Sequence, residues 1–158
     1  MSESDLQVRI YDITDDERAD ALEALRTFGL TFGFDIHSPL TELTLGEGYG
    51  SHSVHLGGVD EFAALLNEMA PSAVFETWQD PHPDADGHYL AHHPAVGTFE
   101  AGCDAEGNPH LPVSEIKSLL AEAAPGMTVS EWLSANSDVV FGSSALAAVK
   151  RAAARVQS

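Results

Sequence analysis

Residues 7–29 read "QVRIYDITDDERADALEALRTFG" and join a strand pattern directly to a helix pattern. Apolar and polar side chains alternate through the first seven of these residues, which is typical of a half-buried strand. Farther on, Leu22, Leu25 and Phe28 recur at helical spacing, and Gly29 follows as a residue that commonly ends a helix. The stretch therefore predicts a strand followed at once by a helix that reaches about Phe28.

The junction between the two elements carries its own signal. Thr14 and Glu17 have the spacing of a capping box, in which each side chain bonds the backbone N–H of the other residue. Asp15 and Asp16 add negative charge where the helix dipole is positive. We expect the helix to begin at this point.

Further elements complete the first half of the chain. Residues 41–45 ("TELTL") and 53–56 ("SVHL") have strand patterns and flank glycine-rich residues 46–52, which we interpret as a flexible hairpin connection. Apolar residues recur at helical spacing over 62–69, and 72–78 ("SAVFETW") is typical of a strand. The order β-α-β-β-α-β predicts a ferredoxin-like split βαβ fold, an antiparallel sheet with its helices on one face.

The second half of the chain predicts more short strands and three helices. The strands are residues 88–94 and 97–103, and the helices are residues 112–123, 129–135 and 143–156. Thr128 and Glu131 repeat the capping-box spacing before the second of these helices. We therefore expect one α+β domain, residues 1–158, in which a core at 1–80 is extended by hairpin-like strands and C-terminal helices at 81–158.

Charge is the most unusual property of the sequence. The chain has 25 Asp and Glu against seven Lys and Arg, a formal net charge of −18. No Lys or Arg occurs between Arg26 and Lys117, a span that holds fourteen acidic residues. Residues 1–149 have 25 acids and four bases, a formal charge of −21, and the remaining three bases lie in the last nine residues.

This charge distribution excludes one class of partner and favours another. Direct nucleic-acid binding needs Lys and Arg to displace counterions, and the body of the chain has almost none. A basic protein surface is attracted by the same field. We therefore expect a non-enzymatic binding or regulatory protein whose acidic face engages a basic partner, with DNA mimicry as the sharpest form of the hypothesis. The predicted face lies between Asp35 and Glu115 and includes Asp80, Asp84, Asp86, Glu100, Asp104 and Glu106.

Acidity also has an interpretation that requires no partner. A high net charge keeps a protein in solution, and a salty cytoplasm selects for many carboxylates and few lysines. A band of carboxylates favours a binding role, whereas an even scatter favours adaptation to solvent.

Residues 80–94 ("DPHPDADGHYLAHHP") raise a second functional hypothesis, a metal-binding protein or small metalloenzyme. His82, His88, His92 and His93 supply donors of the kind that zinc prefers. If residues 88–93 form a strand, His88 and His92 share a face while His93 points the other way. The spacing is not that of a known zinc motif, so a solvated turn with no cofactor is the simpler interpretation.

The remaining predictions concern the cellular compartment, the single cysteine and the oligomeric state. The N-terminus lacks the basic and apolar regions of a secretory signal, and no run of apolar residues is long enough to span a membrane. We therefore expect a cytoplasmic protein. Cys103 has no partner for a disulfide within the chain, and its acidic neighbours argue against a nucleophilic thiolate. An exposed sheet edge or face also allows a homodimer.

Overall fold

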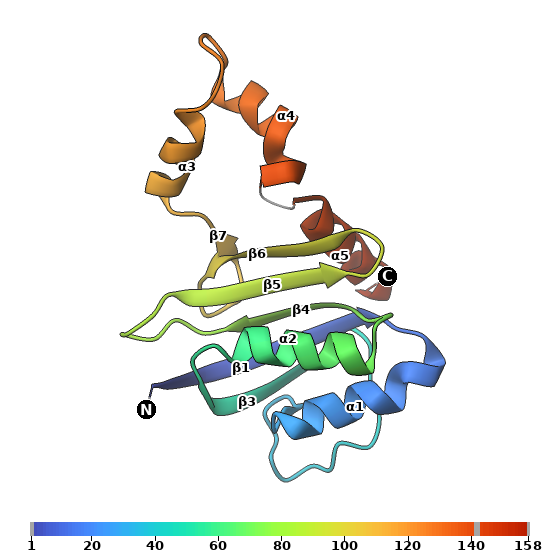
Figure 1. The fold of residues 1–158 in the computed structure, drawn as a ribbon. Coiled ribbons are helices and arrows are strands. Elements are labelled where there is room, and N and C mark those ends of the chain that lie inside the picture. Colours follow the sequence, from blue (N-terminus) through green and yellow to red (C-terminus); the bar gives the residue numbers. More distant parts are fainter. Residues whose placement is uncertain (1, 141–142, 158) are drawn as a thin grey trace.

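The computed structural model describes residues 2–140 and 143–157 and has an α+β architecture (Figure 1). The strands are β1 (Glu3–Asp12), β2 (Thr31–Phe32), β3 (Gly48–His55), β4 (Val74–Gln79), β5 (Gly87–His93), β6 (Gly97–Cys103) and β7 (Pro109–His110). The helices are the 3-10 helix η1 (Asp15–Glu17) and α1 (Arg18–Thr27), α2 (Gly58–Met69), α3 (Val113–Leu120), α4 (Val129–Val140) and α5 (Ser143–Gln157).

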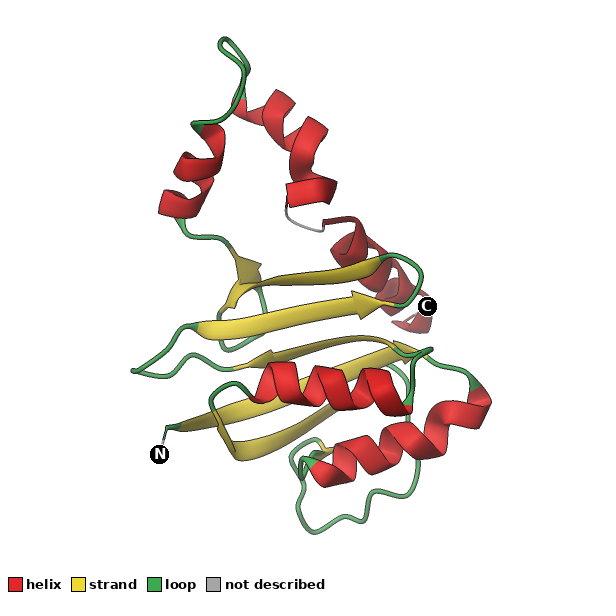
Figure 2. Ribbon diagram, in the orientation of Figure 1, coloured by secondary structure: helices red, strands yellow, loops and turns green. Residues whose placement is uncertain are grey.

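All seven strands form one antiparallel sheet in the order β2-β3-β1-β4-β5-β6-β7. The sheet is larger than a ferredoxin-like fold. The two helices of the first half, α1 and α2, lie against one face as expected, whereas α5 of the C-terminal extension packs on the other (Figures 1 and 2). The strands and helix of the second half thus widen the sheet and cover its second face.

Strand β1 is central, and its side chains alternate between the two faces. Leu6, Val8 and Ile10 are fully buried in the core under α1 and α2, together with Phe62 and Leu66 of α2. The intervening residues of β1 face the α5 side. There a second apolar cluster joins Trp78, Tyr89 and Phe99 of the sheet to Ala145, Val149 and Ala152 of α5. The predicted strand pattern of residues 7–13 is confirmed, and it serves two different cores.

Helix α1 ends as predicted, with Gly29 in the left-handed region at φ +67°. The N–H of Gly29 bonds the carbonyl of Arg26 at 3.0 Å, and the N–H of Leu30 bonds that of Leu25 at 2.9 Å. This pair of bonds is the Schellman motif, which satisfies carbonyls that the helix itself leaves free.

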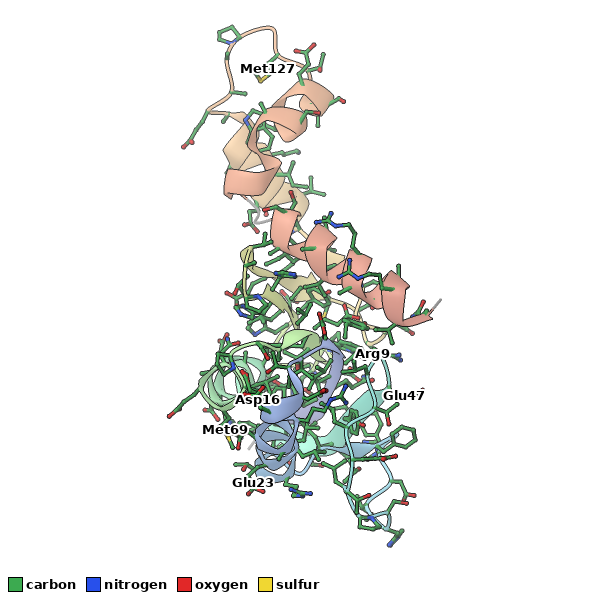
Figure 3. All side chains as sticks on the ribbon, turned by 90° about the vertical axis from the view of Figure 1, so that its right-hand side faces the viewer. Arg9, Asp16, Glu23, Glu47, Met69 and Met127 are labelled. Atoms are coloured by element: carbon green, nitrogen blue, oxygen red, sulfur yellow. The ribbon has the colours of Figure 1, made fainter. Side chains whose placement is uncertain are left out.

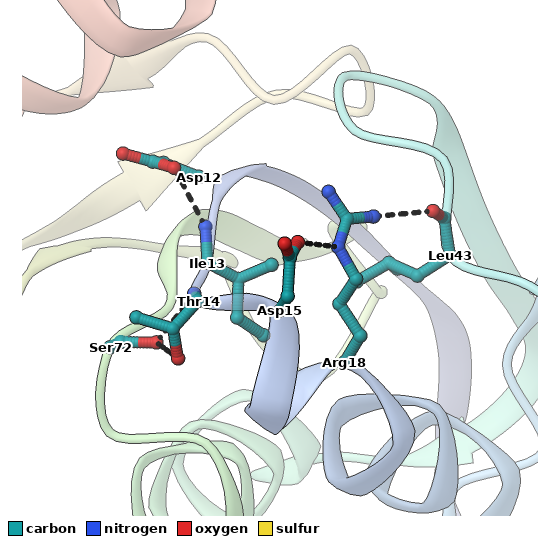
Figure 4. Close-up of polar contacts among 7 residues, drawn as sticks. All are labelled: Asp12, Ile13, Thr14, Asp15, Arg18, Leu43 and Ser72. Carbon is teal, nitrogen blue, oxygen red and sulfur yellow. Dashed lines mark hydrogen bonds and ion pairs between the residues drawn. The ribbon is translucent and has the colours of Figure 1, made fainter.

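The capping box expected at Thr14 is wrong. No cap is formed by the Thr14 side chain; its hydroxyl instead lies 3.1 Å from Ser72 Oγ, before β4 (Figure 4). The Glu17 carboxylate accepts the Ser72 N–H at 3.0 Å. Both side chains therefore bond Ser72 in place of the local backbone. These bonds attach the start of the first helical segment to the loop that leads into β4.

The strand predicted at residues 41–45 is also wrong. These residues form a loop in which Leu43 is buried and its carbonyl accepts a bond from Arg18 at 3.1 Å (Figure 4). Alternate leucines of a loop can pack on a core without any strand partner, which explains the misleading pattern. The glycine-rich stretch is part of β3 instead of a hairpin loop. Gly50 leaves room there for the ring of Phe34, from which a Cβ would lie only 2.3 Å.

The C-terminal helices follow the sequence prediction closely. Glu131 N–H bonds Thr128 Oγ1 at 3.1 Å and Thr128 N–H bonds the Glu131 carboxylate at 3.3 Å, so the second capping box is confirmed. Helices α3 and α4 form an arm that extends from the sheet, with Met127 at its tip (Figures 1 and 3). Among the described residues, no helix has both the length and the apolar character needed to cross a membrane.

A buried carboxylate fixes α5 to the sheet. Glu76 of β4 is 5% exposed and faces α5, where Lys150 Nζ lies 2.9 Å from its Oε2. Tyr11 and Tyr89 donate their hydroxyls to the same carboxylate. Burial, and then the Glu76 charge, raise the pKa of both phenols, which therefore remain protonated donors. Lys150 also lies 5.8 Å from the centre of the Tyr89 ring.

Replacing Lys150 with Met tests this attachment. The substitution leaves the buried Glu76 carboxylate with its phenol donors alone, so we expect the free energy of unfolding to fall by about 1–3 kcal/mol. Arg151→Met, at an exposed position of the same helix, is the matched control and should change stability by less than about 0.5 kcal/mol. Adding Glu76→Gln to Lys150→Met should recover part of the loss, because no charge is then left buried. Urea denaturation measures all four proteins, and equal stability of the two single Met variants would refute the role of the pair.

Candidate functional site

The antiparallel register brings several acidic segments to one end of the sheet. Glu3 pairs with His55, Leu6 with Gln79, and Gly87 with Cys103, so β1 and β5 begin where β3, β4 and β6 end. The first turn of α2 and the loops at 80–86 and 104–108 lie at this same end (left in Figure 1). We call it the acidic end, defined by Glu3, Asp5, Asp60, Glu61, Asp80, Asp84, Asp86, Asp104 and Glu106.

The six carboxylates predicted from sequence do not all share one face. Five belong to the acidic end: Asp80, Asp84, Asp86, Asp104 and Glu106. The sixth, Glu100 of β6, lies on the α2 side of the sheet next to this end, where it bonds His88, which an oxygen of Asp60 also approaches. The sequence prediction missed Glu3 and Asp5, which strand pairing brings to this end, and it did not single out Asp60 and Glu61 at the start of α2.

Local contacts set the chemistry of the predicted carboxylates. Partial burial raises the pKa of Asp80, and the bond from Gln7 acts in the opposite direction. Bonds from the side chain and backbone of Asn108 lower the pKa of Asp104, which organises the turn before β7. Asp84 accepts a bond from Ser2 Oγ at 2.6 Å, whereas Asp86 and Glu106 are exposed. The last two are therefore free to face a partner.

The four histidines proposed as metal ligands do not converge on one another. His82 Nδ1 accepts the N–H of Asp84, and His93 Nδ1 accepts that of Ala95, so each stabilises its own turn. His92 bonds Thr98 Oγ1 at 2.8 Å, and burial lowers its pKa. Only His88 enters a cluster of metal-ligating side chains among the described residues.

That cluster joins three elements. Asp60 of α2, His88 of β5 and Glu100 of β6 place one potential ligand atom each within 4.8 Å of one another. His88 Nε2 is 2.9 Å from Glu100 Oε1 and 3.9 Å from Asp60 Oδ1. Imidazole and carboxylate are both ligands that zinc accepts. Neither carboxylate was predicted as a ligand, because its distance from His88 in the sequence hides the contact.

A cavity of about 420 Å³ adjoins this cluster, and its lining is rich in acidic side chains. Asp86, Glu100 and Glu115 supply carboxylates, and His88 and His110 supply imidazoles; no Lys or Arg is among the residues that line it. Such a lining suits a cation, either a metal ion or the side chain of a basic partner.

Cys103 is a buried structural residue. Burial, with smaller effects from Asp104 and Asp80, raises the pKa of its thiol to about 12. Its Sγ lies 3.7 Å from the carbonyl oxygen of Gln79, and its side chain packs in the cluster under α5. The thiol is therefore almost entirely protonated at neutral pH, as the sequence interpretation expects.

A larger cavity, of about 650 Å³, lies on the other side of the sheet. Gln7, Arg9 and Tyr11 of β1 and Glu76 and Trp78 of β4 form its floor. Helix α5 and the loop at 105–108 also line it. Sequence reasoning missed this site; the one available signal was Glu76, a charge in the middle of an otherwise apolar strand pattern.

A comparison with known protein families gives one match. The family model described as "Protein of unknown function (DUF3145)" matches residues 51–152, more than half of the chain. No curated protein and no solved structure matches. The matched residues include Glu76, His88, Glu100 and Lys150, whereas β1 with Arg9 precedes them. The chain belongs to the DUF3145 family.

Proposed function

We propose that this protein is a binding or regulatory protein whose acidic end engages a basic surface of another protein. The observation that carries the proposal is the convergence of carboxylates from β1, α2 and two loops at one end of the sheet. The stretches that meet there, residues 3–6, 58–61, 80–86 and 104–108, contain no Lys or Arg. Carboxylates that lie close together make the local electrostatic potential more negative than the same number spread evenly over the surface. A surface rich in Lys and Arg gains both encounter rate and orientation from it.

The finer form of the proposal is that the partner binds nucleic acid and that the acidic end occupies its nucleic-acid site. A basic groove that holds phosphates also accepts carboxylates, so the protein and duplex DNA then compete for one surface. The protein in this case inhibits its partner without binding nucleic acid itself.

A second candidate function is metal binding, favoured by the cluster of Asp60, His88 and Glu100. Three protein ligands leave a fourth position open, which is the arrangement of catalytic zinc sites. Both candidates use the same end of the molecule, but they differ in the groups that matter: the metal needs His88, whereas the partner needs the loop carboxylates.

We also infer that the elements from β1 to β4 follow the split βαβ arrangement within the larger sheet. The strand order β2-β3-β1-β4 and the shared face of α1 and α2 support this relation. The remaining strands and α5 are then additions at one edge and on the opposite face.

Neutralising the acidic end should abolish partner binding, whereas an equal change of charge elsewhere should not. The test variant is Asp84→Asn with Asp86→Asn and Glu106→Gln. The control variant carries Asp16→Asn, Asp20→Asn and Glu47→Gln, around α1 and the loop before β3, where Figure 3 labels Asp16 and Glu47. Each variant removes three negative charges from the net −18.

The measurement is capture of partners from cell lysate at about 0.1 M salt, repeated at about 1 M, where the Debye length is only about 3 Å. We expect a basic protein that the wild type and the control retain, that the test variant loses, and that high salt releases. Its displacement by duplex DNA supports mimicry. Equal loss in both variants would reduce the effect to net charge, and no salt-sensitive partner at all would contradict the proposal.

Zinc titration separates the second candidate. Protein prepared without a histidine tag should bind one zinc ion by calorimetry, and His88→Ala should abolish that binding. His92→Ala is the matched control, because His92 lies on the same strand and bonds Thr98 outside the cluster. Zinc binding that both variants retain, or that the wild type lacks, would rule out this site.

A further inference from the structure

The cavity between β1, β4 and α5 differs from the rest of the molecule in charge. Arg9 and Lys150 both line it, which places two of the chain's seven Lys and Arg residues around one cavity of about 650 Å³. Its size falls within the range of small-molecule sites in proteins. The carboxylates that line it are Glu76 and, on the loop at 105–108, Glu106.

The charge of Glu76 is already compensated. Its oxygens accept bonds from Lys150, Tyr11 and Tyr89, so it has little capacity left to act as a base or to bind a cation. This arrangement makes the cavity better suited to binding than to acid–base catalysis.

Arg9 has donor capacity to spare. Its Nη1 bonds the carbonyl of Gly46 at 3.1 Å, and no carboxylate of residues 2–140 and 143–157 pairs with its guanidinium. A guanidinium has five N–H donors in a fixed fork that matches a carboxylate. In Figure 3, Arg9 lies beside the C-terminal part of α5, away from Asp16 and Glu23.

The lining of the cavity also includes an apolar patch. Ala153 and Ala154 of α5 and Ala105 of the loop contribute methyl groups, and Trp78 lines the floor, whereas Gln157 and Asn108 add polar groups. Gly107 keeps the loop close to Trp78, because a Cβ there would lie 2.6 Å from the indole ring. An apolar patch in the same cavity as a cation fits a molecule with an apolar body and one negative end.

We propose that this cavity is a binding site for a small organic anion, a carboxylic acid with an apolar body whose carboxylate bonds Arg9. The site is distinct from the acidic end, although Glu106 belongs to both. A monoanion fits better than a polyphosphate, because the protein has a net charge of −18 and Glu106 lies at the cavity. The bond to Arg9 then provides the main polar anchor, and the alanines exclude water from the body of the ligand.

Three probes of equal shape and different charge test the proposal: benzoate, benzamide and benzamidine. Trp78 reports their binding by fluorescence once Trp132, the only other tryptophan, is replaced by Phe. We expect saturable quenching by benzoate, weaker binding of the neutral amide and none of the cation.

Two variants locate the site. Arg9→Gln should weaken benzoate binding about tenfold or more, the loss typical of a charge-assisted hydrogen bond. Ala154→Phe should fill the cavity from an exposed position of α5 and block all probes without lowering the melting temperature. Arg26→Gln is the matched control, since Arg26 pairs with Glu23 on α1, and it should leave benzoate binding unchanged.

The outcomes that would overturn the proposal are equally specific. Benzamidine binding as tightly as benzoate would assign the cavity to cations. Benzoate binding that survives both Arg9→Gln and Ala154→Phe would place it elsewhere on the protein. No saturable quenching by benzoate would leave the Glu76 network with a purely structural role.

Discussion

Alternation of side chains along β1 is the constraint on which the rest of the structure depends. A strand in the middle of a sheet presents successive residues to opposite faces, so one short segment supplies both Leu6, Val8 and Ile10 to the first core and Gln7, Arg9 and Tyr11 to the other side. The first set is fully apolar and needs helices to cover it. The second set is polar or amphipathic, so the layer above it contains a cavity and the Glu76–Lys150 ion pair beside its apolar cluster.

The same sheet explains how the charge is distributed. Because neighbouring strands are antiparallel, the start of one strand lies beside the end of the next. The connections at the acidic end carry carboxylates. Lys and Arg are found elsewhere, on α1, on α3, in the middle of β1 and along α5. Nine of the 25 acidic residues lie at the acidic end, and six more, between Asp12 and Glu23, lie around the start of α1. Lys150 has a specific role in so acidic a chain. The buried Glu76 carboxylate has lost its hydration, and the ion pair with Lys150 compensates for part of that loss.

Sequence patterns predicted most of the elements but only part of the site. The strand at residues 7–13, the Schellman end at Gly29, the capping box at Thr128 and α5 were all readable, because each depends on residues close together in the chain. Thr14, by contrast, bonds Ser72 in place of its local partner. The triad around His88 and the donors to Glu76 come from separate elements, so no local pattern could reveal them.

Charge separation decides how the two proposed sites relate to each other. A cationic surface drawn to the acidic end meets carboxylates and imidazoles, whereas the cavity under α5 offers Arg9 to an anion. Because salt screens charges over about 8 Å at physiological ionic strength, each site responds chiefly to its own surroundings. Glu106, on the loop at 104–108, connects the two sites, since it belongs to the acidic end and lines the cavity as well. A partner that draws Glu106 away from the cavity removes a negative charge from the anion site, so occupation of the two sites should be mutually favourable.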